Sequence, residues 1–223
     1  MRTRILGLFV LALVMTALPS CNSSADETDS SATAPPDYKP PAKAAEPKPA
    51  PKPAPAAATP ASRPTNTQVV IETNMGTMVV RLDDQRTPIT VANFLQYVDD
   101  KFYDNTIIHR VERNFVIQGG GFDTTLREKE TRPPIINEGK KGRQNTRGTI
   151  AMARTSEPNS ATCQFYINLK HNATLDGGYC AFGEVIEGMD VVDKIGAVPT
   201  ENRGGAFTAI PIEQVVIRSI RRK

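Results

Sequence analysis

The fold of this chain is decided by the stretch His109-Arg-Val-Glu-Arg-Asn-Phe-Val-Ile-Gln-Gly-Gly-Gly-Phe122. If it forms a strand, its two-residue period places Arg110 and Gln118 on the same face. Phe115 has the opposite parity, so it can join them only if the backbone turns or bulges near Asn114. An arginine and a glutamine beside an aromatic ring can bind a neutral carbonyl compound. The stretch has no Ser, Cys or paired carboxylate, so it lacks the nucleophile of a hydrolase.

Four segments of the sequence carry a family resemblance. Phe102-Tyr-Asp-Asn-Thr-Ile-Ile-His-Arg110 leads into the first stretch, and three more follow it: Gly148-Thr-Ile-Ala-Met-Ala-Arg154, Ser160-Ala-Thr-Cys-Gln-Phe-Tyr-Ile-Asn168 and Leu175-Asp-Gly-Gly-Tyr-Cys-Ala-Phe-Gly183. In this order they resemble the cyclophilin family of peptidyl-prolyl isomerases. The resemblance covers residues 67 to 220 and implies an isomerase domain over residues 67–223.

The pattern of the same region predicts many short strands and two helices. Pro88 opens a helical pattern with Thr87 at the N-cap position, and its apolar residues recur at spacings of three and four. A second helical pattern covers residues 188–195. Strands are expected at 68–73, 77–82, 106–110, 115–118, 148–153, 164–168, 179–185 and 212–220. This pattern of strands and helices predicts a mainly β protein, with a barrel capped by helices. The resemblance implies a closed eight-stranded antiparallel β-barrel capped by two α-helices.

The resemblance also implies which residues form the site. Arg110 matches the catalytic arginine of the family, Phe115 the floor of the proline pocket and Gln118 the amide that holds the substrate backbone. The substrate-binding residues implied in the same way are Val116, Met152, Ala153, Arg154, Gln164, Tyr166, Leu175 and Tyr179.

Several positions depart from the family's usual residues. Val116 stands where a methionine is common, and Tyr166 where a phenylalanine is common. Tyr179 replaces the pocket histidine of eukaryotic members, as it does in bacterial relatives. Thr174 occupies the position of a tryptophan linked to tight cyclosporin binding, and the chain has no tryptophan. We therefore expect an active isomerase that binds cyclosporin weakly.

Rotation of a prolyl peptide bond requires no covalent bond to the enzyme. Its barrier of about 18–20 kcal/mol arises from resonance between nitrogen and carbonyl, so the site must bind the twisted amide better than either planar form. Shortening a step of about 100 s to about 1 ms takes roughly 7 kcal/mol. A charge-assisted hydrogen bond from Arg110 to the proline nitrogen supplies about 1.5–3 kcal/mol. Desolvation and positioning in the pocket must supply the rest.

The sequence thus predicts a peptidyl-prolyl cis-trans isomerase that acts on exported, proline-containing polypeptides and needs no cofactor. The alternative is a membrane-tethered module or chaperone that binds proline-containing peptides without significant turnover. Arg110 favours the enzyme, because a pure binder has no need for a donor that acts only in the twisted state. The net charge is only +3 and no basic stretch is interleaved with aromatics, which disfavours nucleic acid as a partner. We expect a monomer.

The start of the chain predicts delivery to the cell envelope. A positive start and the apolar run from Ile5 to Leu18, too short to span a bilayer, are typical of a signal peptide over residues 1–20. Leu18-Pro-Ser-Cys21 resembles the lipobox of bacterial lipoproteins, in which Cys21 is lipidated; ordinary cleavage near Ser20 or an uncleaved anchor is the alternative. Asn22 is not the aspartate that retains enterobacterial lipoproteins in the inner membrane. A periplasm-facing outer-membrane lipoprotein is therefore favoured.

Residues 21–66 have a different composition from the rest of the chain. After Cys21, this segment holds eleven of the eighteen prolines, set among Ala, Lys and Ser. Such a composition cannot bury enough apolar area to offset the entropy of ordering it, so a disordered linker is predicted. Its Lys-Pro and Ala-Pro repeats favour the extended polyproline form, at about 3.1 Å per residue. We interpret it as a semi-rigid spacer; the rival interpretation is a ligand for a proline-recognising or cell-wall-associated partner.

The remaining cysteines and histidines predict no further chemistry. Cys163 and Cys180 fall in strand-like apolar runs, so buried free thiols are expected rather than the disulfide that an envelope compartment permits. A catalytic pair of Cys163 and His109 is disfavoured because nothing nearby supplies a third orienting group. His109 is expected to be a structural hydrogen-bonding residue. Two histidines and scattered carboxylates lack metal-ligand spacing, so no metal site is expected.

Overall fold

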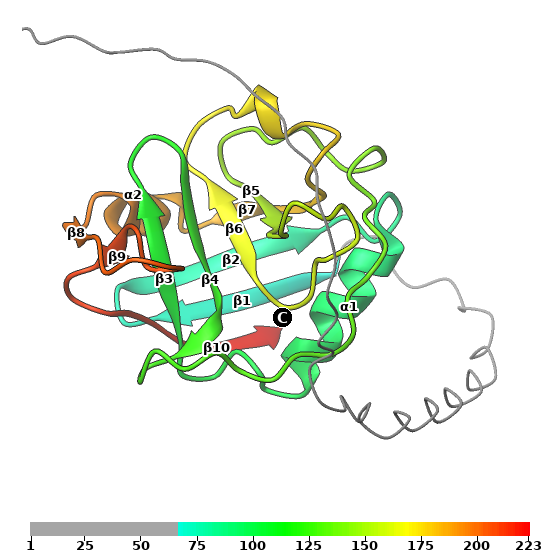
Figure 1. Cartoon of the computed structure of the whole chain (residues 1–223). Helices are drawn as coiled ribbons and strands as arrows, with labels where there is room; N and C mark the ends of the chain where they lie inside the picture. The colour runs from blue at the N-terminus through cyan, green and yellow to red at the C-terminus, as the bar shows by residue number, and fades with distance from the viewer. Residues whose placement is uncertain (1–66) are drawn as a thin grey trace, which may run out of the picture. The chain divides into compact units, whose positions relative to one another are not determined.

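The computed structural model describes residues 67–223, so the predicted signal peptide, lipidated Cys21 and linker lie outside the described residues. Eight antiparallel strands close into a barrel in the order β1-β10-β3-β4-β6-β5-β7-β2 (Figure 1). The prediction of a closed eight-stranded barrel with two helices is confirmed. The barrel strands are β1 (Gln68–Thr73), β2 (Gly76–Leu82), β3 (Thr106–Glu112), β4 (Val116–Asp123), β5 (Thr149–Met152), β6 (Phe165–Asn168), β7 (Ala181–Glu187) and β10 (Val215–Arg222).

Five smaller or helical elements complete the domain. The helices α1 (Pro88–Asp99) and α2 (Met189–Gly196) lie on opposite sides of the barrel in Figure 1. A 3₁₀ turn, η1 (Ala173–Leu175), lies between β6 and β7, and a separate two-stranded sheet consists of β8 (Thr200–Glu201) and β9 (Ile210–Pro211). Neither α-helix in this part of the chain is long and apolar enough to cross a membrane.

The barrel is closed by its first and last strands. β1 pairs with β2 through a hairpin and with β10 on its other side. The Asn74 side chain in the hairpin turn donates to the Gln214 carbonyl at 2.9 Å and accepts from the Val216 N–H at 3.0 Å. At the opposite end of β1, the Lys223 N–H donates to the Gln68 carbonyl at 2.9 Å. Both ends of β10 are therefore fastened to β1 or to its hairpin.

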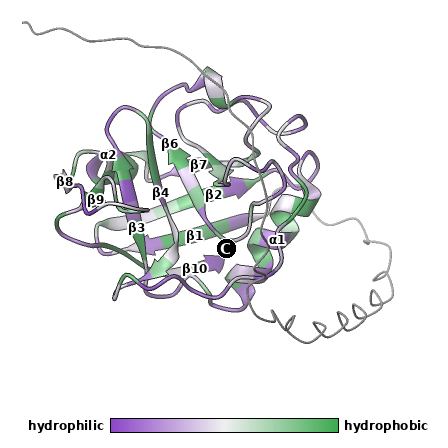
Figure 2. Ribbon diagram, viewed as in Figure 1, coloured by the Kyte–Doolittle hydropathy of each residue, from purple (hydrophilic) through white to green (hydrophobic). Residues whose placement is uncertain are grey.

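The core fills the barrel and continues under both helices. The apolar residues predicted for one face of α1 are buried, and Figure 2 shows apolar and polar residues alternating around this helix. The ring of Phe94 lies 5.2–5.8 Å, centroid to centroid, from three core rings: Tyr103, Phe165 and Phe182. Cys163 and Cys180 are buried and free, which confirms the prediction for the two thiols. Burial raises the pKa of each to about 11.

The N-terminus of α1 receives its side-chain acceptor from a distant loop. Thr87 occupies the N-cap position, but its hydroxyl donates to the Asp83 carbonyl at 2.9 Å and makes no capping bond. Instead the buried Glu138 carboxylate accepts from both the N–H and the hydroxyl of Thr90, each at 2.8 Å. The Thr90 N–H has no partner within the helix, so the carboxylate supplies its acceptor and also interacts favourably with the helix dipole. The predicted N-cap position of Thr87 is confirmed, and the side-chain acceptor at this end is supplied by Glu138.

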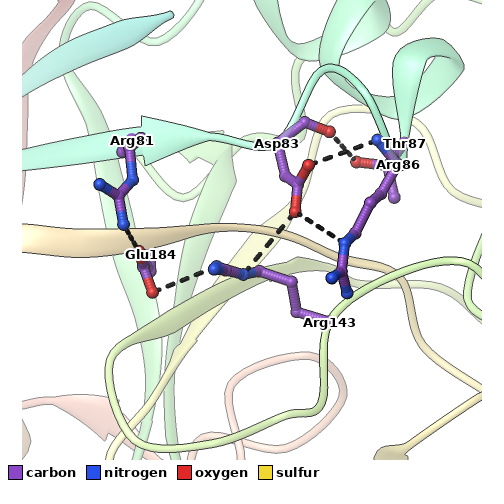
Figure 3. A network of polar contacts seen from close by, with 6 residues as sticks. All are labelled: Arg81, Asp83, Arg86, Thr87, Arg143 and Glu184. Atoms are coloured by element: carbon purple, nitrogen blue, oxygen red, sulfur yellow. Dashed lines mark hydrogen bonds and ion pairs between the residues drawn. The ribbon is translucent and has the colours of Figure 1, made fainter. Parts of the chain in front are cut away.

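A network of ion pairs ties the end of β2 to β7 and to the loop before β5 (Figure 3). Arg143 from that loop lies between two carboxylates, 3.8 Å from Asp83 and 3.3 Å from Glu184. Arg81 also pairs with Glu184, and Arg86 lies 3.6 Å from Asp83. These side chains are part-exposed, so each pair is worth at most about 1 kcal/mol. The network fastens the loop that leads to β5 and to the site described next.

Candidate functional site

The candidate site lies on the outer face of β4, β6, β5 and β7. Side chains alternate along these strands, so that Ile117 and Phe165 belong to the barrel core while Val116 and Tyr166 belong to a second apolar cluster. Ala151 and Ala181 complete this second cluster, and the part-buried residues packed on it are Phe115, Ala153, Leu175 and Tyr179. The outer face of the sheet is therefore apolar at this place, although it faces away from the core.

A cavity of about 130 Å³ opens over the second cluster. Nine of the eleven residues named from the sequence line it: Arg110, Phe115, Val116, Gln118, Ala153, Arg154, Tyr166, Leu175 and Tyr179. They come from the β3–β4 hairpin, β4, β6, the segment after β5 and the loop before β7. The remaining two, Met152 and Gln164, lie elsewhere.

Two backbone irregularities bring Arg110, Phe115 and Gln118 together. Arg110 on β3 pairs with Gln118 on β4, as their common parity predicted. The chain turns between the strands with Asn114 at φ +56°, which places Phe115 beside them and confirms the predicted turn. A register shift between Ile108 and Arg110 adds a second irregularity that the sequence pattern did not indicate. Such a bulge re-aims neighbouring side chains.

The Arg110 guanidinium is held at the rim of the cavity by two partners. It donates from Nη1 to Gln118 Oε1 at 3.3 Å and from Nη2 to Glu112 Oε1 at 2.9 Å. Its Cζ lies 6.0 Å from the centroid of the Phe115 ring. A guanidinium has five N–H donors, and these bonds use two of them. The other donors remain available to a ligand in the cavity.

Arg154 and Tyr179 form the opposite wall. The Arg154 guanidinium lies over the Tyr179 ring at 4.3 Å and donates from Nε to the Gly178 carbonyl at 3.0 Å. It also donates from Nη1 to the carbonyls of Thr155 and Ser156, at 2.8 and 3.3 Å. These bonds hold the Arg154 guanidinium against the Tyr179 ring and join the loop before β7 to the segment after β5.

Gln164 belongs to a neighbouring cavity of about 190 Å³. Its Oε1 accepts a hydrogen bond from Gln118 Nε2 at 3.1 Å. Gln118 therefore lies between the two cavities and lines both of them. The two cavities share Gln118, Ala153 and Arg154. The sequence did not indicate this second cavity, whose other lining residues are Glu128, Thr155, Ser160 and Thr162.

The placement expected for Met152 is wrong. Its side chain is 2% exposed and packs in the barrel core, because its parity on β5 is that of Ile150 and opposite to that of Ala151. Its side chain lines neither of the two cavities described above.

The structural role expected for His109 is also wrong in one respect. His109 Nδ1 is buried and has no hydrogen-bond partner among the described residues. The ring packs instead against Phe122 and Phe207, with centroids 4.8 and 6.4 Å away. Burial, with a smaller effect from the Arg110 charge, lowers the pKa of His109 to about 4. His109 is neutral at pH 7 and faces away from the cavity that Arg110 lines.

Sequence reasoning missed three buried asparagines below the cavity, Asn145, Asn168 and Asn172. They come from separate segments and share no period, so only their burial could have identified them. Burial also raises the pKa of Tyr166, whose hydroxyl donates to Asn145 at 2.8 Å. Within residues 67–223, no three His, Cys, Asp or Glu side chains are grouped so that they could hold a metal ion.

Comparison with known proteins places the whole described region in one family. Residues 68–222 match the family described as cyclophilin type peptidyl-prolyl cis-trans isomerase/CLD. Peptidyl-prolyl cis-trans isomerase B of Escherichia coli (strain K12) is 49% identical over 160 residues, covering 68% of this chain and 97% of that protein. A peptidyl-prolyl cis-trans isomerase of Acinetobacter baylyi is 50% identical over 163 residues, covering 71% and 86%.

A solved structure agrees with these matches. A cyclophilin type peptidyl-prolyl cis-trans isomerase of Cryptosporidium parvum, solved in the presence of the dipeptide Ala-Pro, aligns with a TM-score of 0.57 and 28% identity. The alignment covers 70% of this chain and 98% of that one.

Proposed function

The chain belongs to the cyclophilin family and is a peptidyl-prolyl cis-trans isomerase; on this premise we propose that it isomerises X-Pro bonds of exported proteins from a lipid anchor in the cell envelope. The observation that carries the mechanism is the fixed Arg110 guanidinium at the rim of an apolar cavity floored by Phe115. Binding of the proline ring in this cavity brings the peptide nitrogen next to a charged donor.

The cavity performs the reaction by binding one geometry of the substrate more tightly than the others. The proline ring packs against Phe115, Tyr166 and Leu175, which removes it from water in every state. The Gln118 amide holds the substrate backbone. As the amide twists, its nitrogen regains a lone pair and accepts a hydrogen bond from Arg110. This bond strengthens only in the transition state, so it lowers the barrier rather than merely tightening binding.

The neighbours of Arg110 keep this donor in place. Glu112 and Gln118 hold the guanidinium before the substrate arrives, so little reorganisation is needed at the moment of rotation. The side chain is 29% exposed in the free protein. A bound peptide covers this opening, and the electrostatic interaction becomes stronger as water is excluded.

The test of the mechanism is cis/trans exchange of a short X-Pro peptide, measured by NMR with the wild-type protein and Arg110→Ala. Loss of the charged donor should slow exchange about 10- to 100-fold while the fold is retained. Arg132→Ala is the matched control, since Arg132 also pairs with one carboxylate, Asp100, but lies outside the cavity. If the wild type binds peptide without accelerating exchange, the chain is a binding module and the enzymatic mechanism is wrong.

The site also favours weak cyclosporin binding. Thr174 lies exposed in η1, beside the cavity residue Leu175, and offers no large aromatic surface to a ligand. Nanomolar inhibition by cyclosporin would contradict this.

The envelope location rests on the sequence of residues 1–66. A signal peptide ending before Cys21, lipidation of that cysteine and a proline-rich spacer together hold a monomeric domain near the membrane, where exported chains fold. Full-length protein expressed in a bacterium should incorporate labelled palmitate and fractionate with the outer membrane. Cys21→Ala should abolish both. Recovery of the unmodified wild type in the soluble fraction would contradict the anchor.

A further inference from the structure

Three asparagines lie below the candidate cavity, in the region that the catalytic assignment leaves unused. Asn145 and Asn168 are 0% exposed and Asn172 is 4% exposed. An amide that is buried without partners destabilises the fold, so each of these side chains must be matched by donors and acceptors. We call Asn145, Asn168 and Asn172 the asparagine cluster.

The asparagine cluster forms a continuous series of side-chain hydrogen bonds. Asn172 Nδ2 donates to Asn168 Oδ1 at 2.7 Å, and Asn168 Nδ2 donates to Asn145 Oδ1 at 3.3 Å. Asn168 Nδ2 also donates to Thr149 Oγ1 on β5 at 2.9 Å. The series therefore joins the end of β6, the start of β5 and the loops on either side.

Each end of the series is bonded to a wall of the cavity. At one end, Asn172 Nδ2 donates to the Phe115 carbonyl at 3.0 Å, and the Asn172 carbonyl accepts from the Leu175 N–H at 2.9 Å. At the other end, Tyr166 Oη donates to Asn145 Oδ1 at 2.8 Å. The floor and two walls of the cavity are thus attached to the same three asparagines, Phe115 and Tyr166 through side-chain amides and Leu175 through the Asn172 backbone.

Asn145 also holds the loop that carries Leu175 and Tyr179. Its backbone N–H donates to Asp176 Oδ1 at 2.6 Å, and its Nδ2 lies 3.3 Å from the same oxygen. Nδ2 also lies 3.5 Å from the Tyr179 carbonyl. With two donors on its oxygen and two acceptors at its nitrogen, all four hydrogen-bonding positions of this amide are used.

We propose that Asn145, through the asparagine cluster, is the positioning residue of the proline pocket. Phe115, Tyr166 and Leu175 belong to three different elements: a hairpin turn, a strand and a loop. A pocket assembled from such segments keeps its shape only if something fixes their relative positions. Asn145 does not touch the substrate; it acts through the residues that do. This inference rests on the proposed function, in which the cavity binds the proline ring.

The first test is Asn145→Ala in the full chain, with NMR exchange of an Ala-Pro peptide measured at several peptide concentrations. The loosened walls bind planar and twisted forms less well to the same extent, so the expected change is in KM rather than kcat. We expect KM to rise about tenfold, with kcat within about twofold of wild type. Arg110→Ala should show the opposite division, with the loss in kcat.

The second test separates positioning from general stability. Tyr166→Phe removes only the hydroxyl that Asn145 accepts, and should raise KM about threefold. Tyr103→Phe is the matched control, because Tyr103 Oη is also buried and donates a single bond, to the Cys163 carbonyl at 2.8 Å, away from the cavity. Both variants should lose similar free energy of unfolding, but Tyr103→Phe should leave KM unchanged.

A spectroscopic measurement completes the test. The Leu175 methyl resonances should broaden by microsecond-to-millisecond exchange in Asn145→Ala and stay sharp in Tyr103→Phe. If Asn145→Ala does not fold, Tyr166→Phe against Tyr103→Phe decides the question. Wild-type KM in Tyr166→Phe, or an equal rise in Tyr103→Phe, would overturn the proposal. If the wild type shows no exchange, the proposed function fails, and peptide dissociation constants in the same variants still test the asparagine cluster.

Discussion

The His109 ring lies outside the barrel core, packed edge-on against Phe122 and Phe207 and only 2% exposed. Because burial lowers its pKa from 6.5 to about 4, the native state holds it neutral where the unfolded chain binds a proton. The native state therefore binds fewer protons between these two pH values. Stability from this residue is fully present above pH 6.5 and is lost as the pH falls toward 4.

We expect the free energy of unfolding to fall by about 3 kcal/mol from this residue between pH 6.5 and pH 4. His109→Phe should remove that part of the pH dependence, even if the larger ring lowers stability at pH 7. The measurement is urea unfolding at a series of pH values. His171→Gln is the control, since His171 lies on the surface. An unchanged slope in His109→Phe would show that other groups cause the acid sensitivity.

At the scale of single residues, strand parity was enough to place Arg110 and Gln118 side by side and to require a turn before Phe115. Parity also places Met152 in the barrel core, and it was the family resemblance that named this residue as substrate-binding. Parity could not find Asn145, whose partners come from other segments. Residues that act through long-range hydrogen bonds leave no periodic signal in the sequence.

Helix α1 shows how an element can depend on a residue far from it. The Glu138 carboxylate caps Thr90 at the helix N-terminus and is 6% exposed. Glu138→Ala should lower the free energy of unfolding by about 2 kcal/mol, because it leaves the buried Thr90 N–H without an acceptor and leaves the Thr90 hydroxyl only the Cys180 sulfur as a partner. Glu138→Gln keeps an acceptor for the Thr90 N–H, so its free energy of unfolding should fall by less than that of Glu138→Ala.

Denaturant unfolding measures the effect on α1. Glu213→Ala serves as the control, since Glu213 is exposed, and should change stability by less than about 0.5 kcal/mol. Equal stability of Glu138→Ala and wild type would mean that water replaces the cap.

The N-cap position of helix α2 is occupied by Gly188, where a side chain would not fit. Gly188 has φ +84°, and an added Cβ would lie 2.4 Å from the Thr77 carbonyl oxygen on β2. Gly188→Ala should therefore lower the free energy of unfolding by about 3 kcal/mol or more, measured by thermal or denaturant unfolding. Gly204→Ala isolates the backbone strain, because Gly204 has φ +80° with nothing within 4 Å of an added Cβ. That variant should lose only about 1–2 kcal/mol; equal losses would contradict the steric explanation.

At this scale the periodicity predicted every barrel strand and both helices, and only the short elements were missed. β8 and β9 contain two residues each, which is too short for any pattern. Helix α1 begins at Pro88 as predicted, whereas the ends of several strands differ by a few residues; β4, expected over 115–118, runs from Val116 to Asp123.

In the whole molecule, β10 decides whether the barrel closes. It lies between β1 and β3, and its residues Val215, Ile217 and Ile220 are at most 1% exposed. Removal of residues 215–223 should abolish the cooperative thermal transition, because two strand edges and a side of the core are exposed together. Removal of Lys223 alone takes away one backbone bond and one exposed ion pair, and should leave the transition in place. A cooperative transition in the longer truncation would mean that the other strands close without β10.

The closed eight-stranded topology followed from the family resemblance, since strand patterns alone give no pairing order. The pairing of β1 with β10 joins residues some 150 positions apart, for example Val69 and Arg222. Contacts of this range have no local signature, and neither does the second cavity beside Gln164.

The same pairing sets the order of events for a chain that leaves the ribosome with its amino end first. β1 emerges early and finds β2, but its other edge stays open until residues 215–222 arrive. Throughout that interval the nascent barrel presents the bare edges of β1 and β3, the kind of surface on which holding chaperones act and aggregates form. An enzyme that speeds the rotation of prolyl bonds in other polypeptides cannot close its own barrel until its last strand has been made.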